Sequence, residues 1–253
     1  MLWLSRKDIE HISRRLLRDY LRKVPQKIDH IDPADFAKKI CDLQFAFADI
    51  SEAHDAIGLT ATSGVIITIP QRDGTRLDYE LDGKTAFIDQ SLVAENQIGR
   101  LNFTMMHEAA HQLFWMLYPE EYKVQTPRCV FRTADEHTQY PVLNWEEWQT
   151  NVLTSFLLLP KELVYRHMAD VGLKDGITVL NRIYARKDYE HFSEAAKRLG
   201  VSKTALAIRL SQLGLVGRND LYDPYALVDI FPEKMRSPDM AGRKYGKNQC
   251  KGT

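Results

Sequence analysis

The hydrophobic pattern is densest between Leu101 and Leu117. Apolar residues occur there at helix-period spacing and on nearly every side of the helix. A helix with so little polar surface is buried on most sides. The stretch therefore predicts a long helix that crosses the core of the protein.

Two shorter helices are predicted near the N-terminus. Residues 5–24 form a basic amphipathic pattern with Ser5 as the N-cap. A second helix starts at Asp32 and Pro33, an N-cap followed by a proline in the first turn. The basic face of the first helix either contacts nucleic acid or an acidic partner, or is simply solvated.

Strands are predicted between these helices and the long one. They cover residues 45–50, 64–69, 76–81 and 85–90. Turn sequences separate the last three, so we expect them to form a small antiparallel sheet. Helices packed on such a sheet place the chain in the α+β class.

The second half of the chain is predicted to be mostly helical. Residues 119–143 are a polar connection, and helices follow at 144–160, 161–171 and 177–184. Residues 190–199 and 203–213 resemble a helix-turn-helix, which either binds DNA or packs as a hairpin on the core. We expect four parts: an N-terminal helix (1–29), a catalytic domain (30–170), a helical appendage (171–231) and a basic tail (232–253).

Composition limits the charge, membrane association and redox environment expected of the protein. The 253-residue chain has 34 Lys and Arg against 34 Asp and Glu, so its net charge is zero. It contains no run of 18 apolar residues and no apolar segment typical of a signal peptide, so we expect no membrane helix. Cys41, Cys129 and Cys250 share no metal-type spacing and are predicted to be free thiols in a reducing cytoplasm.

The long predicted helix contains the pattern His-Glu-x-x-His. His107 and His111 stand four residues apart, so they lie on one face and can direct two imidazole nitrogens at one point. Two histidines and a glutamate in a core helix need partners, and a zinc ion would supply them. Glu108 is then placed to accept a proton from a zinc-bound water.

The third zinc ligand is expected from the next helix. Glu147 and Asn151 stand four apart there, so the carboxylate can bind the metal while the Asn151 amide accepts the N–H of a ligating histidine. Glu146 is the alternative ligand. It lies about 100° around the helix, and its spacing to Asn151 is less suitable.

These two segments resemble the ImmA/IrrE family of metallopeptidases. The likeness rests on Arg100 to His111 and on the Glu-x-x-x-Asn helix that ends in Leu158-Leu159-Pro160, and it covers roughly residues 30–165. It implies a zincin-like core and a bacterial zinc peptidase that cleaves a helix-turn-helix repressor, often that of a mobile element. The chain departs from the family at residues 153–156, where the family often has smaller side chains.

A zinc peptidase also needs a donor for the developing oxyanion. Tyr122, His137 and Tyr140 in the polar connection, together with Tyr118 before it, are candidates. The expected activity is zinc-dependent hydrolysis of a protein substrate. The alternative is a DNA-binding regulator whose zinc core is structural or vestigial, although a neutral chain with few basic residues in its helix-turn-helix makes specific DNA binding unexpected.

Overall fold

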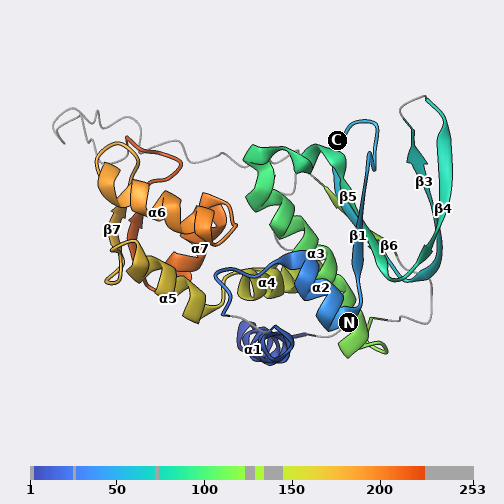
Figure 1. The fold of residues 1–253 in the computed structure, drawn as a ribbon, viewed down its shortest axis with the longest axis horizontal. Coiled ribbons are helices and arrows are strands. Elements are labelled where there is room, and N and C mark those ends of the chain that lie inside the picture. Colours follow the sequence, from blue (N-terminus) through green and yellow to red (C-terminus); the bar gives the residue numbers. More distant parts are fainter. Residues whose placement is uncertain (1–2, 25–26, 72–73, 123–128, 134–144, 226–253) are drawn as a thin grey trace, which may run out of the picture.

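The structure is a computed structural model that describes residues 3–24, 27–71, 74–122, 129–133 and 145–225. This part of the chain has a mixed α+β fold (Figure 1). Its α-helices are α1 (Arg6–Lys23), α2 (Pro33–Cys41), α3 (Ile98–Leu117), α4 (Trp145–Leu158), α5 (Lys161–Asp170), α6 (Arg186–Arg198) and α7 (Lys203–Gln212). Its strands are β1 (Gln44–Ala48), β2 (Ala56–Ala61), β3 (Ser63–Pro70), β4 (Arg76–Asp82), β5 (Thr85–Asp89), β6 (Cys129–Thr133), β7 (Ile177–Leu180) and β8 (Val216–Asn219). Two short 3-10 helices, Gln90–Val93 and Glu95–Gln97, lead into α3.

Both N-terminal helices begin as predicted. In α1, the Ser5 hydroxyl accepts from the Asp8 N–H, and the Asp8 carboxylate accepts from the Ser5 N–H, which completes a capping box. In α2, the Asp32 carboxylate accepts from the N–H groups of Ala34 and Asp35. These local contacts satisfy backbone donors that a helix leaves without partners in its first turn.

The main sheet has four strands in the order β1-β5-β2-β6, with β1 and β5 parallel and β2 antiparallel to both β5 and β6. β3 and β4 form a separate antiparallel pair. The prediction that residues 64–69, 76–81 and 85–90 share one antiparallel sheet is therefore wrong for the last strand. Instead β5 pairs with β1 and β2. Because Ala86, Phe87 and Ile88 are all buried, the backbone N–H and C=O groups of β5 need hydrogen-bond partners on both edges of the strand.

The main sheet lies between α3 and the β3–β4 hairpin (Figure 1). Successive side chains of β5 point to opposite faces. Phe87 joins Ile67 and Leu81 of the hairpin in one apolar cluster, whereas Ile88 packs with Met105 of α3 in another. The main sheet therefore packs on α3 with one face and on the β3–β4 hairpin with the other.

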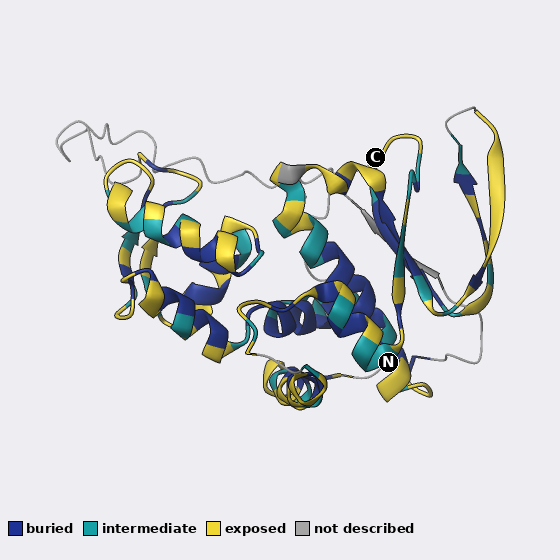
Figure 2. Cartoon of the chain, viewed as in Figure 1, coloured by how far each residue is buried: buried dark blue, intermediate teal, exposed yellow. Residues whose placement is uncertain are grey.

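The long helix α3 is buried along its central part, as the apolar pattern predicted (Figure 2). It packs against α4 and α2 on one side and against β2 and β5 on the other, while α1 packs on α4. Within the described residues, none of the helices combines the length and the apolar character needed to cross a membrane.

The C-terminal helices dock on the start of α3. The turn between α6 and α7 has Gly200 in the left-handed region (φ 66°), and its carbonyl accepts from the Asn102 side chain at 2.8 Å. A Cβ at Gly99 would lie 2.4 Å from the backbone N of Ser202, so turn and helix meet backbone to backbone. The helix-turn-helix-like pair therefore packs on the core.

One predicted element in this region is wrong. Residues 177–184 do not form a helix; Ile177–Leu180 is strand β7, which pairs in parallel with β8. Ile177, Thr178 and Val179 are β-branched, and such side chains favour strands over helices.

Candidate metal centre

Helix α3 presents His107 and His111 on one buried face. Both side chains have lost essentially all exposure to solvent. Their Nε2 atoms lie 3.2 Å apart, and the ring planes are steeply inclined at 76°. The i, i+4 spacing of the helix therefore brings the two nitrogens to one point, as the sequence predicted.

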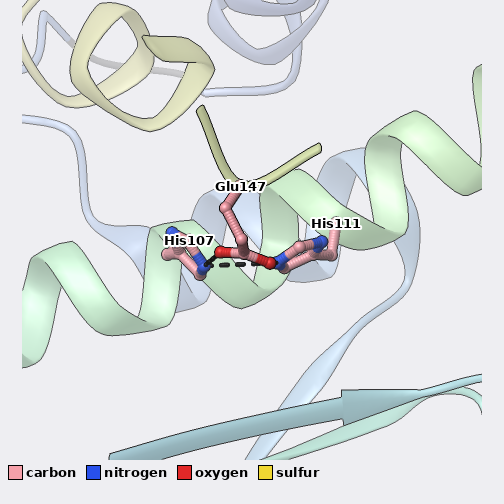
Figure 3. A group of neighbouring side chains, drawn as sticks. All are labelled: His107, His111 and Glu147. Atoms are coloured by element: carbon pink, nitrogen blue, oxygen red, sulfur yellow. Dashed lines mark hydrogen bonds and ion pairs between the residues drawn. The ribbon is translucent and has the colours of Figure 1, made fainter. Parts of the chain in front are cut away.

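Helix α4 supplies the carboxylate of Glu147. One of its oxygens lies 3.1 Å from His107 Nε2 and the other lies 3.1 Å from His111 Nε2, so the group stands between the two rings (Figure 3). Of the two glutamates considered from the sequence, the structure thus brings Glu147 to both histidine nitrogens. These three residues form the one cluster of His, Cys, Asp or Glu with metal-ligand geometry in the described part of the chain.

The spacing of these donor atoms fits a metal ion. A tetrahedral ion with bonds of about 2.1 Å holds its ligand atoms roughly 3.4 Å apart. The two histidine nitrogens lie 3.2 Å apart, the two 3.1 Å contacts of Glu147 are made by different oxygens, and one donor atom from each residue lies within 4.8 Å of the others. Two imidazole nitrogens this close need a proton or a cation between them or beside them, because two lone pairs repel. The cluster could therefore hold a metal, although imidazole and carboxylate ligands are shared by zinc and several other transition metals.

The electrostatics of the metal-free cluster favour a retained proton. Burial lowers the pKa of His111, but the carboxylates of Glu146 and Glu147 outweigh burial and raise that pKa from 6.5 to about 9. Burial raises the pKa of Glu147, but the neighbouring His107 and His111 outweigh it and leave the pKa well below 4.5. A metal ion must displace this proton when it binds.

Glu108 is buried on α3 with its carboxylate against strand β2. A Cβ built on Gly58 would lie 2.4 Å from Glu108 Oε1 and 2.8 Å from Thr104 Cγ2. Sequence reasoning missed Gly58, because the strand that carries it was not predicted. A glycine inside a short apolar run is a signal for such a close approach. The role of Glu108 as a base remains a prediction.

Glu146 lies behind His111. Its Oε1 is 3.8 Å from His111 Nδ1, which is ion-pair distance but too long for a hydrogen bond, and it accepts from Trp115 Nε1 at 3.3 Å. Glu146 therefore faces the ring nitrogen that is turned away from Glu147. Asn151, to which the sequence assigned the contact with a ligating histidine, is half-buried one turn after Glu147, and its assignment remains a prediction.

Two of the four candidate oxyanion donors, Tyr118 and Tyr122, lie among the described residues. Tyr122 is buried, and its ring stacks on Phe114 of α3 with centroids 5.8 Å apart. Tyr118 forms the C-cap of α3. His137 and Tyr140 lie outside the described residues. The role of each of these four residues as an oxyanion donor remains a prediction.

Comparison with known proteins adds no assignment. No protein-family model matches this chain, and a search of curated proteins finds no match either. Any functional interpretation must therefore start from the cluster of His107, His111 and Glu147 itself.

Proposed function

We propose that this chain is a zinc-dependent endopeptidase with a zincin-like core, related to the ImmA/IrrE family. One observation carries the proposal: two imidazole nitrogens from α3 and a carboxylate from α4 meet with neighbouring atoms 3.1–3.2 Å apart. The pattern His-Glu-x-x-His, followed by a glutamate on a later helix, is the ligand arrangement of many zinc peptidases.

Each residue has a distinct task in this proposal. His107, His111 and Glu147 hold the zinc, which when bound makes a water more acidic and polarises the peptide carbonyl. A carboxylate oxygen of Glu108 accepts the proton of the attacking water and later donates it to the nitrogen of the leaving amine. Because Glu108 is fully buried, its carboxylate is held in place by the surrounding protein rather than moving freely in solvent.

The substrate class rests on the sequence resemblance. Family members that share the two motifs cleave helix-turn-helix repressors, so we propose a transcriptional repressor of a mobile element or stress regulon as the substrate, met in the cytoplasm. The metal cluster is compatible with this substrate but does not select it.

The alternative, a DNA-binding regulator, is less consistent with α7. The recognition helix of a DNA-binding helix-turn-helix presents basic and polar side chains to the DNA near its N-terminus. Instead Arg209 is buried and donates to the Leu159 carbonyl, Lys203 donates to the Tyr189 hydroxyl, and Tyr222 donates to the Thr204 hydroxyl. In the described part of the chain, moreover, the metal cluster offers three protein ligands, whereas structural zinc sites have four.

Replacement of the base tests the proposed chemistry. Glu108→Gln keeps the size of the side chain but removes its ability to take a proton. We expect wild type to cleave a co-expressed repressor from the same operon, and Glu108→Gln to retain zinc and fold while losing at least about a hundredfold in rate. The assay is run in the stressed host as well as in vitro, in case an activator is needed. Equal loss of repressor with both proteins would show that the protein acts by binding.

A further inference from the structure

The outward face of α1 carries a row of basic side chains, here called the basic stripe. Its members are Lys7, His11, Arg14, Arg15, Arg18 and Arg22. All six are exposed, and at 100° per residue they fall within about 100° of the helix circumference. The buried residues Ile9, Leu16 and Tyr20 lie on the opposite side, against the core.

Positive charge is concentrated in this helix. Residues 6–23 contain seven Lys and Arg but three Asp and Glu, although the whole chain is neutral. Arg14 pairs with Glu10 at 2.7 Å, and Arg22 approaches Asp19 at 3.5 Å. Within the described residues, no carboxylate lies within ion-pair distance of Lys7, Arg15 or Arg18. All three side chains are exposed, so a partner can reach them in the described structure.

The form of the basic stripe indicates what that partner is. The apolar side of α1 is already buried against the core, so it cannot insert into a bilayer as membrane-surface helices do. Arginine predominates, and its planar guanidinium binds phosphate oxygens in pairs. The helix is about 27 Å long, which matches several successive phosphates of a nucleic-acid strand.

We propose that the basic stripe of α1 binds the phosphate backbone of nucleic acid without reading its base sequence. Such binding differs from operator recognition by α6 and α7, and it does not depend on catalysis by the metal centre. A peptidase that associates with DNA in this way would be concentrated near repressors bound there. The interaction is electrostatic and weakens as salt concentration rises.

The test is a fluorescence-anisotropy titration of the full-length protein with two labelled DNA duplexes of unrelated sequence, between 50 and 200 mM salt. We expect wild type to bind both duplexes equally, with affinity falling steeply with salt. Arg15→Glu/Arg18→Glu should weaken binding at least about tenfold and reduce the slope of log affinity against log salt by about 2, because about 0.9 is lost per phosphate contact. Arg15→Lys/Arg18→Lys keeps the charges and should retain most of the slope.

Lys197→Glu/Lys203→Glu is the matched control. It makes the same change in net charge on exposed residues of α6 and α7, and we expect binding within about threefold of wild type. Circular dichroism and thermal unfolding confirm that the variants fold. The proposal is overturned if wild type does not bind at 50 mM salt, or if the control loses as much affinity as the stripe variant. It is also overturned if the stripe variant loses binding to phosphatidylserine vesicles but not to DNA.

Discussion

The carboxylate of Glu108 occupies the space that a side chain would need at Gly58. A Cβ at this position of β2 would lie 2.4 Å from Glu108 Oε1, closer than real Cβ contacts occur. The missing side chain lets α3 approach the strand and fixes where the proposed base can lie.

Gly58→Ala should therefore destabilise the protein. The added methyl group must displace the Glu108 carboxylate or Thr104, and overpacking of this kind costs about 1–3 kcal/mol. Urea unfolding of the metal-free protein measures this cost. In a Glu108→Ala background the same substitution should cost less, because the main obstacle is gone. Equal costs in both backgrounds would mean that the glycine does not hold open the space for Glu108.

The pH dependence of stability should differ between metal-free and metal-loaded protein. The pKa of His111 is raised from 6.5 to about 9. Its contribution to the free energy of unfolding is therefore complete below pH 6.5 and is lost as the pH rises through 9. The pKa of Glu147 is lowered below 4.5, so its contribution is present above pH 4.5 and is lost on acidification. The metal-free protein should thus lose stability between pH 6.5 and 9.

Metal binding should show the opposite trend, because the metal competes with the proton of His111. Zinc affinity should rise with pH up to about 9, as measured with a competing chelator. Urea unfolding of the metal-free and zinc-saturated protein across this range provides the comparison. His111→Gln removes the titrating group. If that variant kept the same decline in metal-free stability, the decline would have another origin.

Glu146 should support His111 without binding the metal. It faces His111 Nδ1 at 3.8 Å and is itself held by Trp115. Glu146→Gln should keep one metal per chain but weaken affinity by about 10- to 100-fold, the usual effect of losing a partner of a ligating histidine. Trp115→Phe should have a smaller effect. Asn151→Ala, measured in parallel, tests the sequence-based assignment, and unchanged affinity in Glu146→Gln would refute the role given to that residue here.

The sequence predicted the candidate metal-binding cluster because helical periodicity places His107 and His111 on one face, and the i, i+4 spacing to Asn151 favours Glu147 on the next helix. His107 and His111 lie on one face at any tertiary arrangement, and Glu147 needs only a second helix beside the first. The contact of Gly58 with Glu108 and that of Glu146 with Trp115 join different elements and depend on how those elements pack. No local pattern contains such contacts.

The sheet was harder to predict for the same reason. Turn residues identified the β3–β4 hairpin, which is a local structure. The parallel pairing of β1 with β5 joins residues such as Phe45 and Ala86, although β2, β3 and β4 lie between these two strands in the sequence. Strand β2 is short and apolar, and β6 lies in a connection of mostly polar residues. Both are placed by long-range pairing, β2 with β5 and β6, and β6 with β2.

The central claim is that His107, His111 and Glu147 together hold one metal ion. The most direct measurement is the zinc content of purified wild type, His107→Ala, Glu147→Ala and Glu146→Ala by elemental analysis after dialysis. The account predicts about one zinc per chain in wild type, retained zinc in Glu146→Ala, and loss of zinc in His107→Ala and Glu147→Ala. Full zinc in Glu147→Ala, or a wild type that binds none, would contradict it.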